Sequence, residues 1–267
     1  MKRENNMKFY EDIAKELNDR GYDAETVAVS KNGISKTGIV IGKGRIRATF
    51  YPSPENSINA AVEIILKEYE KQCIPKIDLK EITSWEFIKD HMQLCIQKKT
   101  DEKILKKEFL DMEMYIRVDV LGTGTYKFLA SIADCRFGAD IDEVFSRAMA
   151  RLKDNIDIMP LKDVIGYGDF PQETMPVQLV VTTKSKLHGA SAICCDELLR
   201  AIANRYESNL VILPLSIHEC SISVDNEPDM ETYHEMVAEV NRTHVDPVDQ
   251  LTSHAYFYDR ETGKITW

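Results

Sequence analysis

The sequence predicts an α+β protein built from repeated strand-pair-plus-helix units, with largely antiparallel sheets and helices packed on one face. Runs with apolar residues at every second position indicate strands, and runs with apolar spacings of three and four indicate helices. Short turns rich in glycine and asparagine separate successive strands, which is typical of antiparallel hairpins. The repeated units share no sequence identity, so we interpret the repeated order as a similarity in the arrangement of elements alone.

The N-terminal part contains one complete unit. An amphipathic helix is expected to end at Gly21, and the Asn32-Gly33 pair supplies residues that tolerate the positive φ of a hairpin turn. The elements predicted for this part are a helix over residues 8–20, strands over 26–30, 38–41 and 45–51, and helices over 57–71 and 84–99.

The remaining elements follow the same alternation. Met114, Ile116 and Val118 alternate with polar residues, which predicts a strand with one buried face. Acidic residues at the start of the next helix suit the helix dipole. The predicted strands cover residues 113–121, 126–133, 177–182, 209–213 and 216–224, the predicted helices cover 140–155, 191–206 and 229–240, and a hairpin joins 255–258 to 264–267.

A segment rich in glycine and proline divides the chain in this prediction. We expect an N-terminal α+β part over residues 1–157, a linker over 158–176 and a C-terminal part over 177–267. The two parts are expected to pack as one compact body.

Charge and hydropathy narrow the class of protein. The net charge of −10 disfavours direct binding to duplex nucleic acid, which requires a basic surface. The basic cluster of Lys98, Lys99, Lys103, Lys106 and Lys107 is interrupted by acidic residues and is interpreted as a solvated helix face. No apolar run is long enough to span a membrane, and the polar N-terminus lacks the apolar core of a secretory signal. We therefore expect a cytoplasmic protein.

The six cysteines are scattered and form no C-x-x-C pair. A structural zinc site requires closely spaced pairs of cysteine or histidine. The cysteines are accordingly expected to be free thiols in a reducing compartment, and we predict no metal and no cofactor.

Five of the six histidines fall in the last third of the chain, where we place the candidate catalytic residues. Histidine serves as acid or base near neutral pH, and His218-Glu219 lies beside Ser216. Asn241 either caps the preceding helix or contacts the strand that carries His218. The candidates are Ser216, His218, Glu219 and Asn241, and a structural role for His218 is the competing hypothesis.

A second candidate site is the loop between the strand over residues 177–182 and the next helix. A glycine near a helix N-terminus can direct backbone N–H groups at an anion, and lysines add positive charge. The candidate binding residues are Lys184, Lys186, His188 and Gly189. The alternative is an ordinary loop capped by Ser191, because the order of a Walker loop is absent.

Several segments of the last third carry a family resemblance: Val180-Val181-Thr182-Thr183 with Gly189-Ala190, residues 212–219, residues 236–241, Leu251-Thr252 and residues 256–259. With these segments the chain resembles the bacterial domain-of-unknown-function 5688 family, which is seen in gut anaerobes and on integrative conjugative elements. The chain differs from the family's usual residues at Thr183, Leu215 and Thr252. The resemblance implies a bacterial cytoplasmic protein linked to mobile DNA and implies no activity.

These observations favour a non-enzymatic accessory or mobile-element cargo protein. It would bind a macromolecular partner, most simply another protein, in element maintenance or counter-defence. A homo-oligomer is an open alternative for the partner. The alternative function is a hydrolase or nuclease-like enzyme with a site around His218 and Glu219.

Overall fold

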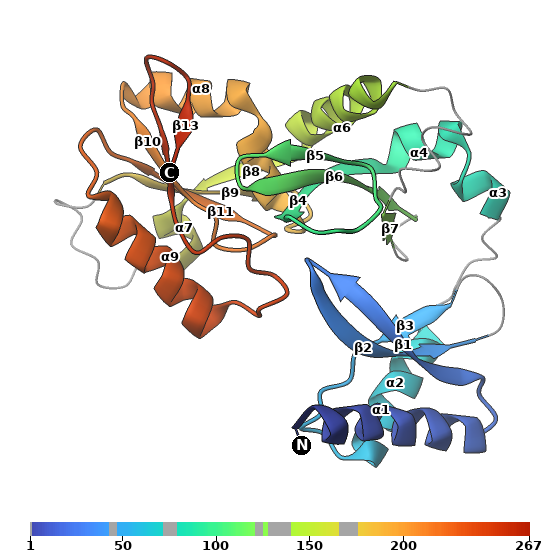
Figure 1. Ribbon diagram of the computed structural model, residues 1–267. Coiled ribbons are helices and arrows are strands. Elements are labelled where there is room, and N and C mark those ends of the chain that lie inside the picture. The colour runs from blue at the N-terminus through green and yellow to red at the C-terminus, as the bar shows by residue number, and fades with distance from the viewer. Residues whose placement is uncertain (1, 43–46, 72–78, 121–124, 128–139, 166–175) are drawn as a thin grey trace. The chain divides into compact units, whose positions relative to one another are not determined.

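The computed structural model describes the chain apart from residue 1 and residues 43–46, 72–78, 121–124, 128–139 and 166–175 (Figure 1). The chain divides into two compact units, Met1–Ile77 and Asp78–Trp267. The sequence prediction had placed the division at residues 158–176. The difference arises because β8 (Ile156–Pro160) pairs along its whole length with β9 (Gln178–Thr183), so both sides of the predicted linker share one sheet.

The first unit is a three-stranded antiparallel sheet with two helices on one face. Gly21 ends α1 with a φ of 90°, and Asn32 and Gly33 turn the first hairpin with φ values of 51° and 75°. Apolar residues of both helices share one core with the sheet, among them Ile13 and Ile65. The elements are α1 (Lys2–Asp19), β1 (Ala24–Lys31), β2 (Ile34–Ile41), β3 (Ala48–Phe50) and α2 (Ile58–Lys71), with strand order β1-β2-β3.

The second unit contains two antiparallel sheets. In the middle sheet the strand order is β4-β6-β5, with β7 also paired to β6, and in the C-terminal sheet it is β13-β12-β10-β11-β9-β8. The other elements of this unit are α3 (Leu79–Ile82), α4 (Trp85–His91), β4 (Met92–Lys98), β5 (Lys106–Phe109), β6 (Met112–Asp119), β7 (Thr125–Lys127), α6 (Ile141–Asn155), α7 (Leu161–Ile165), η2 (Gly189–Cys194), α8 (Asp196–Tyr206), β10 (Leu210–Leu213), β11 (Cys220–Val224), α9 (Met230–His244), β12 (Tyr256–Tyr258) and β13 (Ile265–Thr266). The predicted α+β class with antiparallel sheets is confirmed.

The C-terminal sheet buries both faces. Leu210 and Ile212 belong to the main core, together with Leu199 of α8 and residues of the middle sheet. Val211, which points to the other face, packs with Val237 of α9. Helices therefore cover both faces of this sheet, whereas the prediction placed helices on one face.

The predicted helix over residues 84–99 is wrong in its second half. Helix α4 ends at His91, and β4 begins at Met92. Strand β6 supplies a pairing partner for every residue of β4, which outweighs the local helical spacing. The lysine cluster is consequently no helix face, because Lys98 ends β4 and Lys106 begins β5.

Three other predictions need adjustment near the candidate sites. The helix expected over residues 191–206 is a 3-10 segment, η2, followed by α8. Strand β11 begins only at Cys220, so His218 lies in a loop and not on a strand. Helix α9 continues to His244, so Asn241 lies within the helix and does not cap it. Residues 128–133 of the strand predicted over 126–133 lie outside the described residues, and so does Leu121 at the end of the strand predicted over 113–121.

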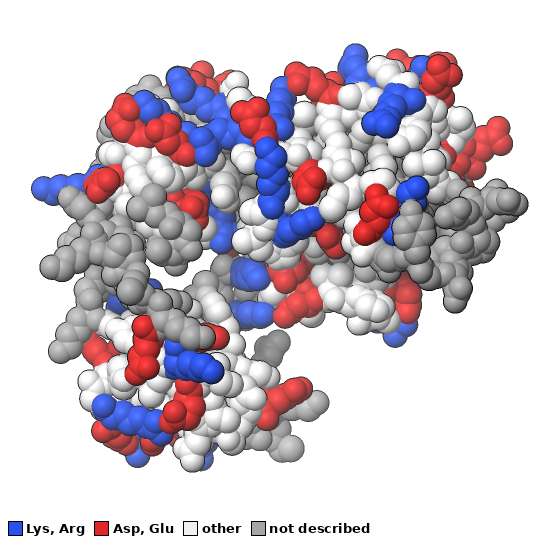
Figure 2. Space-filling view, turned by 180° about the vertical axis from the view of Figure 1, so that it is seen from behind, with Lys and Arg blue, Asp and Glu red and all other residues white. Residues whose placement is uncertain are grey.

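None of the described helices combines the length and apolar character needed to cross a membrane. Among the described cysteines, Cys95, Cys194, Cys195 and Cys220 are free, as predicted. On the face shown in Figure 2, acidic and basic side chains of the described residues are interspersed, without a continuous basic surface.

Candidate functional site

The loop that follows β9 has a constrained backbone. Lys186 and His188 both adopt left-handed conformations, with φ values of 61° and 54°. The Lys186 N–H donates to the Thr183 carbonyl at 2.8 Å, and the Thr183 hydroxyl donates to the Leu187 carbonyl at 2.9 Å. These contacts hold the loop in one shape and leave Leu187 58% exposed.

Gly189 lets η2 approach β9 very closely. A Cβ atom at this position would lie 2.4 Å from both the Thr182 Oγ1 and the Thr183 backbone nitrogen. The Gly189 N–H donates to the His218 carbonyl at 2.9 Å. The glycine therefore serves close packing, and the N–H that the anion hypothesis requires is occupied by a carbonyl.

The two lysines of the anion hypothesis are also engaged by neighbouring groups. The Lys184 ammonium donates to the Asp154 carbonyl at 2.7 Å, and the Lys186 ammonium lies 3.6 Å from the Asp157 carboxylate. Ser191 does not cap α8, because it lies in η2 and its hydroxyl donates to the His188 carbonyl at 2.9 Å.

His218 lies at the centre of the loop between β10 and β11. Its backbone N–H donates to the Ser216 hydroxyl at 3.0 Å, which closes a tight turn. The His188 backbone N–H donates to Nδ1 of His218 at 3.2 Å, and Nε2 lies 3.8 Å from the Asp249 carboxylate. Because Nδ1 accepts here, the proton of the neutral ring resides on Nε2, which faces Asp249.

Arg117 of β6 connects this loop to the middle sheet. Its guanidinium contacts Nε2 of His188, and the His188 and His218 rings are 5.3 Å apart between centroids. An arginine side chain can only donate, so His188 accepts through Nε2. We call Arg117, His188, His218 and Asp249 the histidine centre. Both rings accept N–H donors in it, which suits a neutral, structurally constrained pair.

The structure brings together some of the predicted site residues and separates others. Ser216, His218, His188 and Gly189 meet at the histidine centre. Glu219 is exposed, and only its backbone carbonyl closes the turn by accepting from the Ser216 N–H at 3.1 Å. Asn241 is buried in α9 and donates to the Thr252 carbonyl at 2.6 Å.

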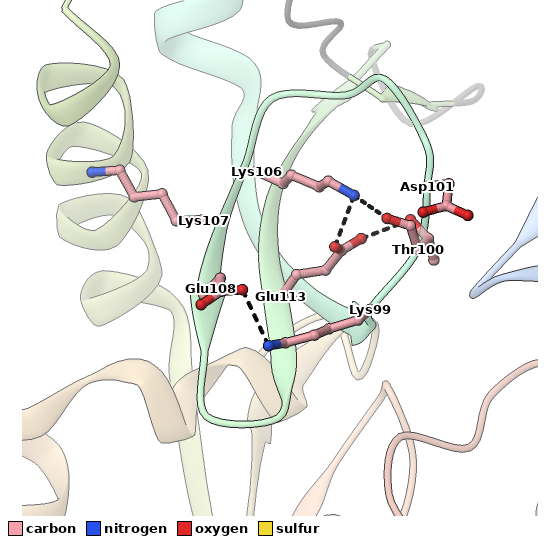
Figure 3. A pocket seen from close by; sticks show the side chains of 7 residues that line it. All are labelled: Lys99, Thr100, Asp101, Lys106, Lys107, Glu108 and Glu113. Carbon is pink, nitrogen blue, oxygen red and sulfur yellow. Dashed lines mark hydrogen bonds and ion pairs between the residues drawn. The ribbon is translucent and has the colours of Figure 1, made fainter.

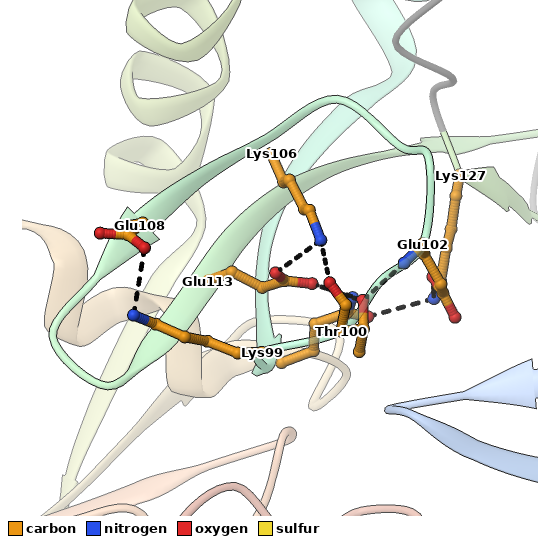
Figure 4. A network of polar contacts seen from close by, with 8 residues as sticks. Lys99, Thr100, Glu102, Lys106, Glu108, Glu113 and Lys127 are labelled. Carbon is orange, nitrogen blue, oxygen red and sulfur yellow. Dashed lines mark hydrogen bonds and ion pairs between the residues drawn. The ribbon is translucent and has the colours of Figure 1, made fainter.

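A buried polar network on the middle sheet was missed by sequence reasoning (Figure 4). Gln97 of β4 and Glu113 of β6 are paired across the sheet and are 1% and 4% exposed. One Glu113 oxygen accepts from Gln97 at 2.7 Å and from Thr100 at 2.8 Å, and the other lies 3.0 Å from the Lys106 ammonium. Lys127 donates to Gln97 at 3.1 Å. The only sequence signal was alternation, which suggested that this polar face was solvated.

The network keeps Glu113 ionised. Burial by itself raises the pKa of the Glu113 carboxyl, but hydrogen bonds from Gln97, Lys106 and Thr100 outweigh it and hold the pKa below its ordinary value. Beside the network, burial raises the pKa of the Cys95 thiol to about 12. Cys95 is therefore a neutral thiol at physiological pH and not an activated nucleophile.

A pocket of about 490 Å³ opens over this network (Figure 3). Each lysine of the lining pairs with a carboxylate: Lys106 with Glu113, Lys99 with Glu108 at 3.2 Å, and Lys107 with Asp142 of α6. The Lys107 side chain extends away from the others. Three lysines and three acidic residues line the pocket, so its walls do not favour a ligand of either charge. The lining consists of Lys99, Thr100, Asp101, Lys106, Lys107, Glu108 and Glu113.

Within the described ranges, no three histidine, cysteine, aspartate or glutamate side chains are arranged to hold a metal ion. No curated protein and no solved structure matches the chain. A family model matches residues 5–260, and the chain therefore belongs to the family of unknown function DUF5688.

Proposed function

We propose that the chain is a non-enzymatic protein that binds another protein through the loop after β9, residues 184–188. The observation that carries this proposal is the exposed Leu187, which lies between two non-glycine residues in left-handed conformations. Strained backbone that the surrounding structure maintains is often found at functional sites. An apolar side chain on a rigid loop loses little conformational entropy on binding, which favours a protein partner.

Leu187 has the supports that a docking residue requires. The Thr183 hydroxyl holds the loop by donating to the Leu187 carbonyl. The C-terminal end of the loop is held by the His188 backbone N–H, which donates to Nδ1 of His218. Lys184 and Lys186 flank the leucine with exposed positive charge. An apolar group surrounded by charged groups is the usual composition of an interface centre and its rim.

A hydrolase or nuclease-like enzyme is the second candidate, favoured by the Asp249 carboxylate 3.8 Å from His218 Nε2. A carboxylate that orients a histidine is a common element of acid–base catalysis. Against it, Nδ1 of His218 accepts a backbone N–H, and the Ser216 hydroxyl accepts the His218 backbone N–H. Neither group is directed at a shared reacting atom, so we rank this candidate second.

The proposed setting is the bacterial cytoplasm, with the chain as cargo of a mobile element in element maintenance or counter-defence. This part of the proposal rests on the resemblance of the last third of the chain to a family seen on such elements.

Affinity capture from an extract of the source cells tests the proposal. We expect Leu187→Asp to lose the partner that the wild-type chain captures. Met236→Asp, at an exposed apolar position of α9 (39% exposed), should retain it. Both substitutions should change the free energy of unfolding by no more than about 0.5 kcal/mol, because both side chains are exposed. Equal capture by all three proteins would refute the loop as the binding site, and hydrolysis abolished by His218→Gln would establish the enzyme instead.

A further inference from the structure

Strand β8 forms one edge of the C-terminal sheet. Among the residues that the structure describes, β9 supplies its only strand partner. The Asn155 carbonyl accepts from the Lys184 N–H at 2.9 Å, so the backbone groups of Asn155 are directed at the β9 side. In an antiparallel pair, the N–H and C=O groups of successive residues point alternately toward the partner strand and away from it. The residues whose backbone groups point away from β9 are therefore Ile156, Ile158 and Pro160.

This free side of β8 lacks the usual protection against strand pairing. Edge strands are commonly protected by lysine or by proline, because a charge or a missing N–H opposes a second strand. Ile158 occupies the centre of β8 and is apolar and 40% exposed. Pro160 lies at the end of the strand, where its carbonyl is still able to accept a hydrogen bond. The free side of β8 is therefore competent to bind another strand.

We propose that β8 is a self-association surface, at which two copies of the chain pair their β8 strands in antiparallel orientation about a twofold axis at Ile158. In this register Ile158 and its counterpart exchange two backbone hydrogen bonds. Each Ile156 N–H donates to the Pro160 carbonyl of the second copy, so the missing N–H of proline leaves only the Ile156 carbonyl without a strand partner. The two C-terminal sheets then form one continuous sheet. This proposal does not rest on the function proposed for the loop after β9.

The charges beside this strand favour a second copy as the occupant. The Lys186 ammonium lies 3.6 Å from the Asp157 carboxylate and 3.3 Å from the Met159 sulfur. In the twofold register Met159 stands opposite Asp157 of the second copy, with Cβ atoms about 4.5–5.5 Å apart on one face of the sheet. Each Lys186 ammonium is then placed between two carboxylates, one from each copy. A second copy brings this carboxylate with it, whereas an unrelated strand does so only if its sequence has an acidic residue at that position.

The opposite edge of the same sheet does not compete for β8. Strand β13 contains only Ile265 and Thr266, so pairing between β8 of one copy and β13 of another would be short. Such pairing would also leave a free β8 and a free β13 at the two ends and would continue without closing. Pairing of β8 with itself uses the same surface on both copies and is complete with two chains. We therefore expect a dimer and no larger species.

Sedimentation velocity of the full-length chain at increasing concentration tests the proposal. The wild-type chain should shift from monomer to dimer as its concentration rises, because association follows mass action. Ile158→Lys places two like charges opposite each other at the axis and should remain a monomer. Asp157→Lys places like charge beside each Lys186 and should also remain a monomer. Ile141→Lys, at a similarly exposed apolar position of α6 (38% exposed), is the matched control and should dimerise as the wild type does.

Hydrogen exchange of individual amides locates the contact without a substitution. The Ile156 and Ile158 amides should gain protection as the wild-type concentration rises. The Asp157 and Met159 amides already face β9 and should not change. The proposal is overturned if the wild type stays a monomer at every concentration, if Ile158→Lys or Asp157→Lys dimerises as the wild type does, or if Ile141→Lys loses the dimer. A dimer in which the Ile156 and Ile158 amides gain no protection would overturn it as well.

Discussion

Replacing Gly189 with alanine tests whether close packing explains this residue. The added Cβ would lie 2.4 Å from Thr182 Oγ1 and Thr183 N, and 2.5 Å from Thr182 Cα. These atoms belong to a strand backbone and a β-branched side chain, so neither can rotate away. Segment η2 would have to move away from β9.

The cost follows from what that movement breaks. Overpacking of a dense site costs roughly 1–3 kcal/mol. The hydrogen bonds from Gly189 N to the His218 carbonyl and from Ala190 N to the Ile217 carbonyl would lengthen. Each such bond contributes about 0.5–1.5 kcal/mol. We therefore expect Gly189→Ala to lower the free energy of unfolding of the second unit by roughly 2–6 kcal/mol.

Urea unfolding measures this change, provided that the slope with denaturant stays the same in both proteins. Leu187→Asp in the same loop is the control, and it should stay within about 0.5 kcal/mol of the wild type. A Gly189→Ala protein as stable as the control would refute the close-packing explanation. The anion-binding hypothesis would then regain Gly189 as a ligand residue.

Three further predictions concern other parts of the chain. His218→Gln should cost under about 1 kcal/mol, because the amide oxygen can accept the His188 N–H, whereas His218→Ala should cost roughly 1–3 kcal/mol in thermal melts; equal losses would contradict the acceptor role. Glu113→Gln should also cost roughly 1–3 kcal/mol at pH 7. Since the pKa of Glu113 is lowered on folding, its contribution is complete above the unfolded value near 4.3 and is lost as the pH falls through the folded value. Urea unfolding from pH 7 to pH 3 should therefore lose less stability in Glu113→Gln than in the wild type, and parallel profiles would count against the network. Residues 1–77 should fold alone, because their core is their own, and a poorly dispersed NMR spectrum of that fragment would disprove this.

Local signals predicted much of the secondary structure. The Asn32-Gly33 turn and the Gly21 helix end depend on backbone conformations that few residues tolerate, and the structure has both. Helix α6 begins after Asp140, whose side chain accepts from the Asp142 N–H. Such features need only neighbours in the sequence, which is why a single sequence reveals them.

The candidate site was predicted only in part. The chain order already places His188 and Gly189 in one loop, so their proximity was visible from the sequence. Asn241 was misplaced because its helix continues for three more residues, to His244. Its side-chain amide donates to the carbonyl of Thr252, which lies in the loop after the helix. Arg117 and Asp249 were missed, since neither belongs to a local motif and both reach the histidines through the fold.

The sequence by itself determined the α+β class, the first hairpin and the main helices. It also determined the alternation of apolar and polar residues along β6. Only the tertiary structure decided that residues 92–98 form a strand, because their pairing partner begins more than a dozen residues later in β6. It also decided that the polar face of the middle sheet is buried around Glu113, and that Asp111 meets His254. These outcomes depend on contacts between residues distant in sequence. Such contacts produce no pattern of apolar residues within either segment, so a single sequence does not reveal them.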